Sequence, residues 1–460
     1  LNQRLTDGVY LGVVPIARIG SHLRVEAPGE VVEYAVKMRR LDFEQTLLRR
    51  LQRDAVSMEL LAALADRLAE FYCAAARSPE IDRWGTPEAV WFNIRENLDQ
   101  TEPYIGVVLA PLQHRWIASI SERFLRERLD LFQRRIAEGR IVEGHGDLHL
   151  AHVFVESDSP PRFQIVDCIE FNPRLRCGDV AVDLAFLSMD FDHHGRSDWA
   201  RWLTLRASDA LDDPELPLLV HFYSVYRAHV RNKVNCFRLD ELAPESDEFA
   251  AVRTQAERYI DLATSYLVEP AEPLLLLVGG LSGTGKSALA RRLARCLSIP
   301  VYSSDIIRKE LAGVARERRA ELPYGADIYG PELTRATYRT LLDRAAAELA
   351  AGRSVVLDAT FLDREWREAA RALAAQYGAR PMLVECCCPA EIVAERLRYR
   401  AQEPGQASEA TWPIYLEQRA RYGEAMEPIA GLEHRTVDTA QPLPLVLDVV
   451  LSWLPLRERL

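Results

Sequence analysis

The sequence has 460 residues, which at roughly 150 residues per domain predicts about three domains or two large ones. Its 48% hydrophobic and 27% charged residues are ordinary values for a globular protein, so they exclude a wholly disordered chain. With 57 Lys and Arg against 68 Asp and Glu, the net charge is −11, which disfavours nucleic acid and anionic membranes as partners.

The sequence shows no sign of a membrane segment or a secretion signal. No apolar run reaches the roughly 20 residues that a membrane helix needs, and residues 1–8 lack the profile of a signal peptide. We therefore expect a cytoplasmic protein. The eight cysteines contain no CxxC pair, so we expect buried, reduced thiols rather than disulfides or zinc. Because the chain begins with Leu1 rather than Met, we expect a longer natural protein.

The first half of the chain mixes helical patterns with short strands. Long helical patterns at 56–76 and 116–138 surround strand-like segments at 31–38, 141–143 and 163–167. This mixture predicts an α+β domain.

A histidine-flanked acidic loop, GHGDLHLAHVFV, follows the second of these strands. Asp147 lies in this loop, and Asp167 ends an apolar strand twenty residues later. Two carboxylates so spaced suit one acting on a hydroxyl proton and the other holding Mg²⁺. A zinc cluster of His145, His149 and His152 is an alternative, but the spacing does not keep the three on one helix face.

The loop resembles the catalytic loop of aminoglycoside-phosphotransferase-like kinases, relatives of the protein-kinase fold, and the likeness continues to about Tyr266. The resemblance implies that Asp147 is the catalytic base, that Asp167 is a Mg²⁺ ligand, and that Asp183 braces the loop. That fold expects Asn as the second metal ligand, where this chain has His152. Since imidazole is a poor ligand for Mg²⁺, the metal has one fewer protein ligand or the site is attenuated.

The ATP-binding lobe of this kinase-like domain also departs from the expected pattern. VVEYAVKM at 31–38 offers Lys37 as a phosphate-binding lysine, but no glycine-rich hairpin precedes it. In the larger two-domain proteins that the chain resembles, a segment like 11–16 follows the strand with that lysine. This favours a lysine upstream of Leu1 and predicts a partial N-lobe.

A Pro- and Glu-rich segment marks the expected domain boundary. Residues 268–273 (VEPAEP) predict a linker between a first domain at 1–267 and a second at 274–460. In the second domain short apolar runs alternate with helical patterns, and the runs lie at 275–278, 300–303, 354–357, 382–386 and 435–437. The alternation predicts an α/β fold with a doubly wound, mostly parallel sheet.

The first of these apolar runs leads into GLSGTGKS and then a helical pattern, which is a Walker A motif in its expected context. In such a loop, backbone N–H groups surround a phosphate, the lysine reaches the outer phosphates and the serine hydroxyl ligates Mg²⁺. We therefore expect ATP and Mg²⁺ as cofactors, with Ser287 as a metal ligand. The expected nucleotide-binding residues are Gly280, Ser282, Gly283, Thr284, Gly285, Lys286 and Ser287.

Two further strand ends carry carboxylates, and ligands of such sheets collect at the carboxyl ends of the strands. Asp305 follows the second strand, where it suits a base for an acceptor hydroxyl, with a helix N-cap as the alternative. Arg308, one helical turn on, suits an anionic group of the substrate. Asp358 follows the third strand and would orient the acceptor, hold a metal-bound water or make a structural hydrogen bond.

Two arginines precede a small, polar segment at 401–411. Arg396 and Arg400 are four residues apart, so they share a helix face, and the segment beyond is expected to close them over the nucleotide. They would then neutralise charge on the transferring phosphoryl group. A solvated charged face is the alternative.

With these motifs, residues 274–454 resemble the P-loop kinase group that includes polynucleotide-kinase-like, gluconate-kinase-like and zeta-toxin-like proteins. The resemblance implies that Asp305 is the base, that Arg308 binds substrate and that the arginines of a lid stabilise transfer.

Together these observations predict a phosphotransferase with two kinase-type domains that transfers the ATP γ-phosphate to a hydroxyl of a small molecule. The catalytic candidates are Asp147, Asp305, Lys286, Arg396 and Arg400. A polynucleotide-end or toxin-like kinase, which would need a basic groove, is one alternative. A regulatory ATP-binding protein with a degenerate first domain is another.

Overall fold

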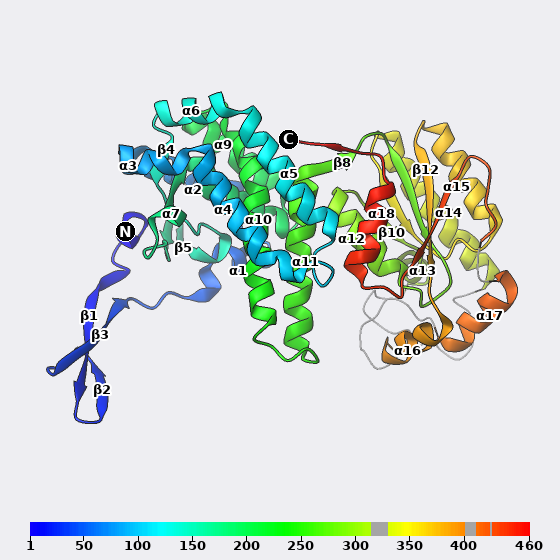
Figure 1. Ribbon diagram of the computed structural model, residues 1–460, viewed down its shortest axis with the longest axis horizontal. Coiled ribbons are helices and arrows are strands. Elements are labelled where there is room, and N and C mark those ends of the chain that lie inside the picture. Colours follow the sequence, from blue (N-terminus) through cyan, green and yellow to red (C-terminus); the bar gives the residue numbers. More distant parts are fainter. Residues whose placement is uncertain (314–329, 401–410, 424–425) are drawn as a thin grey trace. The chain divides into compact units, whose positions relative to one another are not determined.

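The structure is a computed structural model, and it describes residues 1–313, 330–400, 411–423 and 426–460. These residues form two compact units, drawn in Figure 1. Unit 1 comprises Leu1–Asn97 and Ser121–Val230, and unit 2 comprises Leu98–Ile120 and Arg231–Leu460. None of the helices in the described ranges is both long and apolar enough to cross a membrane.

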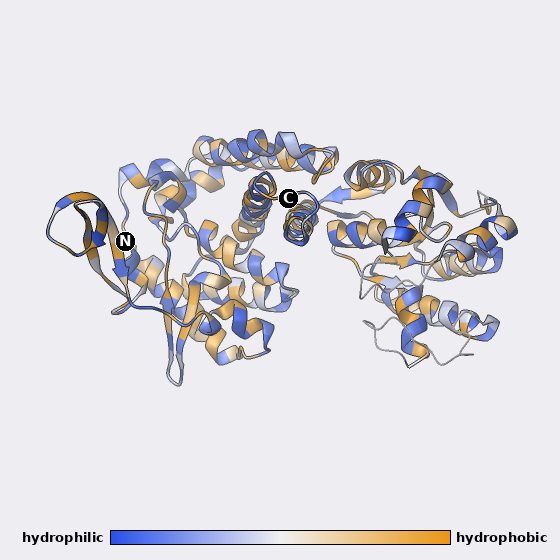
Figure 2. Ribbon diagram, turned by 90° about the horizontal axis from the view of Figure 1, so that it is seen from below, coloured by the Kyte–Doolittle hydropathy of each residue, from blue (hydrophilic) through white to orange (hydrophobic). Residues whose placement is uncertain are grey.

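Unit 1 begins with a three-stranded antiparallel sheet that is largely open to solvent. β1 (Tyr10–Ile19) lies between β2 (His22–Val25) and β3 (Glu30–Met38). Lys37 on β3 forms an ion pair with Glu26 at 2.8 Å. The sheet contributes little to the core, because many of its apolar side chains are exposed: Leu11, Val13, Ile19, Leu23, Val25, Val31, Val32, Tyr34, Val36 and Met38. In Figure 2 the ribbon of this sheet has both hydrophobic and hydrophilic colours.

The rest of unit 1 contains two more strand pairs. β4 (Ile141–Glu143) pairs antiparallel with β7 (Cys177–Asp179), and β5 (Val153–Asp158) pairs antiparallel with β6 (Pro161–Ile165). The acidic loop that the sequence analysis singled out lies between β4 and β5 and ends in a short 3₁₀ helix, Leu150–His152. These strands therefore determine where the loop begins and ends.

Helices make up most of unit 1. The helix predicted at 56–76 is α2 (Met58–Ala74), whereas the pattern at 116–138 is two helices, α5 (Pro111–Glu127) and α6 (Leu129–Ala137), separated at Arg128. The break lets Phe132 on α6 contact the ring of Phe124 edge-on. The other helices lying wholly or partly in this unit are α1 (Leu47–Gln52), α3 (Pro79–Asp82), α4 (Pro87–Thr101), α7 (Pro173–Arg176), α8 (Val180–His193), α9 (Ser197–Ala210) and α10 (Leu216–Leu239).

Unit 2 is built on a parallel five-stranded sheet, which confirms the predicted α/β fold of the second half. The strand order is β10-β11-β9-β12-β13, and each neighbouring pair is parallel. The strands are β9 (Leu274–Gly279), β10 (Val301–Ser303), β11 (Val355–Asp358), β12 (Arg380–Cys387) and β13 (Glu433–Asp438).

Helices cover both faces of this sheet. Along β9, Leu274, Leu276 and Val278 belong to one apolar core with α12 (Lys286–Leu297) and α18 (Leu443–Trp453). Leu275 and Leu277 belong to the opposite core, with α14 (Pro331–Ala350) and α15 (Arg364–Gln376). Because β9 is buried on both faces, it reads as an unbroken apolar run in the sequence. The remaining helices of the α/β fold are α13 (Ser304–Leu311), α16 (Ala390–Arg400) and α17 (Trp412–Tyr422).

Unit 2 also includes residues that precede the expected boundary. Residues 98–120 and 231–267, including α11 (Asp247–Leu267), pack with the α/β fold. The first part of the expected linker is a strand, β8 (Val268–Pro270), which pairs antiparallel with β14 (Leu456–Glu458). The division into two compact units therefore falls near residues 97, 120 and 230 rather than at 268–273. The domain bounds 1–267 and 274–460 stay a prediction.

A buried ionic cluster joins α11 to α12. Asp261 on α11 is completely buried and accepts hydrogen bonds from Arg292 at 2.8 Å, Arg295 at 2.9 Å and Gln113 at 3.1 Å. Burial alone would raise the pKa of Asp261, but the two guanidinium groups lower it. Because α12 begins at Lys286, this cluster helps to hold the helix that carries the Walker A lysine.

Candidate nucleotide and acceptor site

The Walker A loop connects β9 to α12 in a conformation that requires glycine. Gly280 has a φ of +127°, and a Cβ there would lie 2.4 Å from the carbonyl oxygen of Cys386. Gly283 has a φ of +82°, and a Cβ would lie 2.8 Å from Val393. Side chains at these positions would therefore be both strained and obstructed, which explains the two glycines physically.

Lys286 lies folded over this loop. Its side chain is almost fully buried, and Nζ donates to the carbonyl oxygen of Leu281 at 2.8 Å. The hydroxyl of Thr284 donates to the same oxygen, also at 2.8 Å. The lysine is therefore held against the backbone of its own loop.

A cavity of about 300 Å³ lies beside the loop. It is lined by Lys286 and Ser287 from α12, by Asp305 and Arg308 from α13, and by Asp358 from β11. The structure thus brings together five residues that the sequence placed at strand ends or in the Walker A motif. They meet because the carboxyl ends of β9, β10 and β11 lie along one edge of the parallel sheet.

The two carboxylates of the cavity differ in environment. Asp358 is nearly fully buried, and burial raises its pKa, although the charge of Lys286 and the Ser287 hydroxyl act in the opposite direction. Asp305 is half-buried in the first turn of α13, where Ser303 rather than Asp305 is the N-cap residue. The N-cap alternative for Asp305 is therefore wrong.

A hard cation fits the oxygen atoms beside the loop. The hydroxyl of Ser287 lies within hydrogen-bonding reach of the Asp358 carboxylate, next to the Walker A lysine. Hydroxyl and carboxylate oxygens are ligands that Mg²⁺ prefers. The residues present therefore suit a magnesium ion.

Arg308 is buried in the wall of the cavity. It is 9% exposed, and Nη1 donates to the Thr334 hydroxyl of α14 at 3.2 Å. A guanidinium group in this position favours a negatively charged or strongly polar ligand.

The sequence analysis missed the contribution of α17 to the cavity. Gln418, Arg421 and Tyr422 of α17 line it, together with Asp363. The Tyr422 hydroxyl donates to Asp363 at 2.7 Å, and burial together with this bond raises the tyrosine pKa to about 12. The Gln418 side-chain oxygen accepts a hydrogen bond from the Ser282 amide at 2.9 Å. No motif marks these residues, because tertiary packing alone brings α17 to the loop.

A second cavity, of about 550 Å³, lies on another side of the loop and is lined by Gly285, Arg396, Tyr399 and Thr439. Nη2 of Arg396 donates to the carbonyl oxygen of Thr439 at 2.6 Å. The side chain of Arg400 and residues 401–410 lie outside the described residues.

In unit 1, Asp183 holds the acidic loop through its backbone. Its carboxylate accepts from the amides of His145 at 2.6 Å and Gly146 at 2.8 Å. A Cβ at Gly144 would lie 2.4 Å from the same carboxylate, so the loop can approach this closely only with glycine there.

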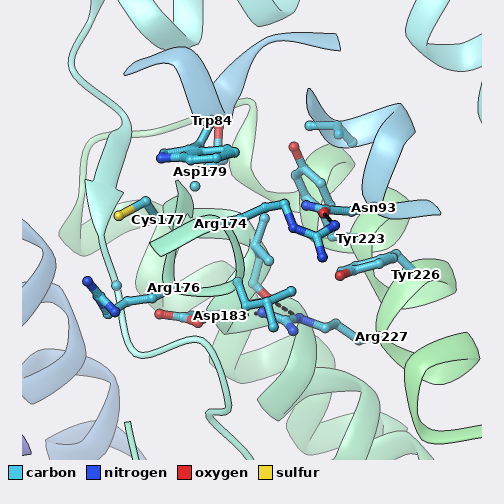
Figure 3. Close-up of a pocket in the computed structure, with 15 residues that line it drawn as sticks. Trp84, Asn93, Arg174, Arg176, Cys177, Asp179, Asp183, Tyr223, Tyr226 and Arg227 are labelled. Carbon is cyan, nitrogen blue, oxygen red and sulfur yellow. Dashed lines mark hydrogen bonds and ion pairs between the residues drawn. The ribbon is translucent and has the colours of Figure 1, made fainter. Parts of the chain in front are cut away.

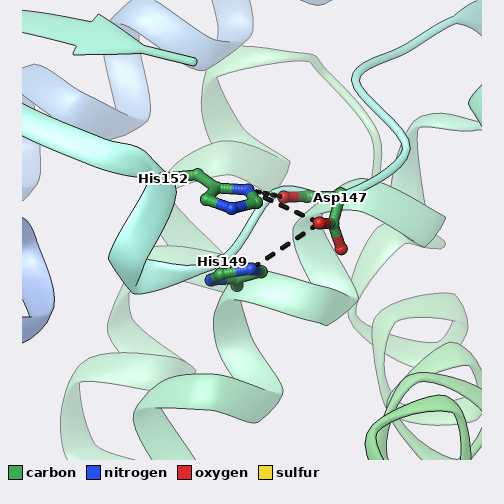
Figure 4. A group of neighbouring side chains, drawn as sticks. All are labelled: Asp147, His149 and His152. Atoms are coloured by element: carbon green, nitrogen blue, oxygen red, sulfur yellow. Dashed lines mark hydrogen bonds and ion pairs between the residues drawn. The ribbon is translucent and has the colours of Figure 1, made fainter. Parts of the chain in front are cut away.

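Figure 4 shows Asp147, His149 and His152 of this loop. His152 lies between the carboxylates of Asp147 and Asp167, with Nδ1 at 3.5 Å from the former and Nε2 at 3.5 Å from the latter. His145 is turned toward the Val166 carbonyl oxygen, at 3.0 Å, and burial lowers its pKa to about 4. Within the described residues, one group of side chains brings its potential metal-ligand atoms together: Asp147, His149 and His152. His145 is not part of this group.

Unit 1 also contains a small pocket behind this loop, shown in Figure 3. It holds about 30 Å³ and is lined by Trp84, Arg174, Tyr226 and Arg227, with Asp183 in its wall. This volume accommodates one or two waters but no nucleotide.

The chain is similar in sequence to known proteins, and these similarities show its family. Residues 275–425 match the family described as the AAA domain. "Uncharacterized protein Rv2004c" of Mycobacterium tuberculosis is 34% identical over 444 residues, which are 96% of this chain and 83% of the relative. "Uncharacterized protein Mb2027c" of Mycobacterium bovis matches with the same values.

Among solved structures, a sugar kinase from Janibacter is 22% identical and covers 39% of this chain and 94% of its own, with a TM-score of 0.30. The Mycobacterium tuberculosis APS kinase CysC is 20% identical and covers 40% of this chain and 98% of its own, with a TM-score of 0.28. TM-scores this low carry no argument about function. The 34% identity over almost the whole chain shows that this protein belongs to the family of the mycobacterial proteins Rv2004c and Mb2027c.

Proposed function

We propose that unit 2 is an ATP-dependent phosphotransferase that acts on a hydroxyl group of a small molecule. The observation that carries the proposal is the cavity of about 300 Å³ in which Lys286 and Ser287 face Asp305 and Arg308. A phosphate-binding lysine, a carboxylate able to accept a proton and a guanidinium group able to hold a substrate line the same cavity. Phosphoryl transfer depends mainly on such positioning and on charge neutralisation.

Each group then has a role in the transfer. The backbone amides of the Walker A loop and Lys286 bind the phosphates of ATP, while Ser287 and Asp358 would hold Mg²⁺, which neutralises phosphate charge when bound. Asp305 accepts the proton of the acceptor hydroxyl as its oxygen attacks the γ-phosphorus and ADP leaves. Arg308 holds the acceptor through a polar or anionic group.

The second cavity suits the nucleoside of ATP. It adjoins Gly285 at the start of α12 and includes the exposed ring of Tyr399, on which a base can stack. Arg396 lies at the same cavity but is bonded to Thr439, so it must turn to contact the transferring phosphoryl group. The Arg400 side chain lies outside the described residues, so its proposed role, to neutralise charge on the transferring phosphoryl group, rests on the sequence.

The lining of the acceptor cavity favours a small molecule over a polynucleotide end. Besides Arg308 and Arg421, it contains Asp305, Asp363 and Glu417. Such mixed charge is unlike the basic groove that tracks a phosphate backbone.

The Asp305→Asn variant tests the proposed base. We expect Asp305→Asn to lower acceptor-stimulated ADP release by about 10²- to 10⁴-fold, because the hydroxyl proton loses its acceptor, while ATP affinity stays near the wild-type value. ADP release by the full chain would be measured with ATP, Mg²⁺ and panels of sugars, polyols and sugar acids.

Asp343→Asn, an exposed change on α14, is the matched control and should leave the rate unchanged. Wild-type turnover in Asp305→Asn would contradict the assignment. ATP binding without any acceptor-stimulated turnover in the wild-type protein would instead favour the regulatory alternative.

For unit 1 the resemblance supports a second candidate function, in which Asp147 is the base of a kinase site and Asp167 and His152 hold the metal. Two observations support this role. Asp183 holds the loop through its backbone amides, and the carboxylates of Asp147 and Asp167 both face His152.

The same ADP-release assay tests this second site. Phosphoryl transfer that survives Lys286→Ala should disappear when Asp147→Asn is added, because the variant without Lys286 has lost phosphate binding in unit 2 and the second change removes the proposed base of unit 1. If Lys286→Ala by itself abolishes all transfer, unit 1 is not an independent kinase.

A further inference from the structure

The Asp147–His149–His152 cluster of unit 1 has the composition of a transition-metal site. One carboxylate and two imidazoles offer ligand atoms that all lie within 4.8 Å of one another (Figure 4). The side chains of His149 and His152 are 11% and 18% exposed, and that of Asp147 is 33% exposed. The cluster is therefore sheltered, yet it opens to solvent on the carboxylate side.

The distances within the cluster suit a tetrahedral ion. The Asp147 carboxylate oxygen lies 3.7 Å from Nε2 of His149 and 3.5 Å from Nδ1 of His152. Ligand atoms on a tetrahedral zinc ion, with bonds of about 2.0–2.1 Å, are about 3.3–3.4 Å apart. The two distances to the Asp147 oxygen are therefore within a few tenths of an ångström of those on a zinc ion, and the two imidazole nitrogens lie within 4.8 Å of each other.

Asp167 can support His152 in this role. In the structure Nδ1 of His152 lies 2.9 Å from the Asp147 carbonyl oxygen and so carries the proton of the ring. Moving that proton to Nε2, which lies 3.5 Å from the Asp167 carboxylate, would leave Nδ1 to bind a metal. A carboxylate on the far nitrogen of a metal-binding histidine orients the ring and raises its basicity. Asp167 thereby supports the ligand without binding the ion itself.

We propose that Asp147, His149 and His152 form a binding site for a divalent transition-metal ion such as Zn²⁺. Two nitrogen ligands and one carboxylate favour Zn²⁺ or Co²⁺ over Mg²⁺, which prefers oxygen. Three protein ligands leave a fourth position for water or a substrate atom. Binding gives up two bonds at the rings: Ala151 N–H to Nδ1 of His149, at 3.3 Å, and Nδ1 of His152 to the Asp147 carbonyl, at 2.9 Å.

The proposal does not depend on phosphoryl transfer in unit 2, and it competes with Asp147 as the base of a kinase. A carboxylate bound to the metal cannot also accept the proton of a hydroxyl. The metal content of unit 1 therefore decides between the two roles of Asp147.

Cobalt binding to the full chain without nucleotide tests the site, because Co²⁺ replaces Zn²⁺ and its visible absorption reports coordination. We expect one equivalent of Co²⁺ with the intense absorption of a four-coordinate ion, displaced by Zn²⁺ but not by millimolar Mg²⁺. His152→Asn and His149→Asn should each weaken binding by at least about tenfold. His22→Asn, an exposed histidine on β2, is the matched control and should bind as the wild type does.

Thermal unfolding of each variant separates loss of a ligand from loss of the fold. If the more buried His149 variant is unfolded, His152→Asn and Asp147→Asn carry the test. Equal Co²⁺ affinity and an unchanged spectrum in folded His152→Asn would overturn the proposal. Effective competition by Mg²⁺ in the wild type would also overturn it and favour the kinase role of this loop.

Discussion

Single charged residues in the core link the parts of unit 2 that are distant in sequence. Arg292 is 1% exposed, and Asp261, with no exposed surface, is its partner at 2.8 Å. A buried pair of this kind contributes little compared with an apolar replacement, but removing one partner leaves an uncompensated charge. The pair therefore makes the docking of α11 on α12 specific.

The Asp261→Asn variant should destabilise the folded chain by about 3–5 kcal/mol, because Arg292 and Arg295 lose their shared carboxylate. Replacing both partners by apolar residues, in Asp261→Leu with Arg292→Met, should restore much of this loss. The measurement is urea unfolding of the full chain, with the exposed Asp343→Asn as the control. A change below about 1 kcal/mol in Asp261→Asn would contradict the role of the pair.

The same residue predicts a pH dependence with a definite sign. The pKa of Asp261 is lower in the folded protein than its ordinary value of 3.8. Its contribution to stability is therefore fully present above that ordinary value and is lost as the pH falls through the lower, folded pKa. The difference in stability between wild type and Asp261→Asn should be constant from pH 5 to 8 and shrink below about pH 4.

At the scale of elements, the Walker A segment was predictable because its strand, loop and helix are consecutive in the sequence. The strand, the glycine-rich loop and the helix occupy consecutive residues, so β9, the loop and α12 follow from one motif. The helical pattern at 116–138 was predicted correctly except for the break at Arg128, on either side of which the rings of Phe124 and Phe132 are in contact. Periodicity alone does not show such a break.

Helix α17 shows the same limit at the candidate site. Its sequence carries no motif, yet Gln418 contacts the Walker A loop and Tyr422 is bonded to Asp363. These contacts form between segments that are 136 and 59 residues apart. The sequence therefore singled out the Walker A and strand-end residues that line the cavity, but not helix α17, which lines it too.

At the scale of the whole molecule, the boundary of the nucleotide-binding unit is the main difference from the sequence analysis. Residues 98–120 and 231–267 pack with the α/β fold, and β14 at its end pairs with β8. A fragment of residues 274–460 would expose the part of the α12 surface, apolar and ionic, that residues 98–120 and 231–267 cover in the full chain.

We therefore expect the fragment 231–460 to unfold at a higher temperature, and more cooperatively, than the fragment 274–460. The longer fragment keeps the bonds of Asp261 to Arg292 and Arg295, although not the one from Gln113, and it keeps the β8–β14 pair; the shorter fragment has neither. Circular dichroism during heating is the measurement, with intrinsic fluorescence as a second probe. Equal midpoints for the two fragments would show that α11 is not part of the folding unit.

The sequence by itself determined the parallel α/β fold and the position of the Walker A loop, because apolar periodicity and glycine spacing act over short stretches of chain. It also identified Asp305, Arg308 and Asp358, since residues at strand ends share one edge of a parallel sheet. Only the tertiary structure decided that α17 completes the cavity, that α11 belongs with the nucleotide-binding unit, and that Asp147 rather than His145 joins the two histidines. Those outcomes depend on packing between distant segments, for which the sequence carries no local signal.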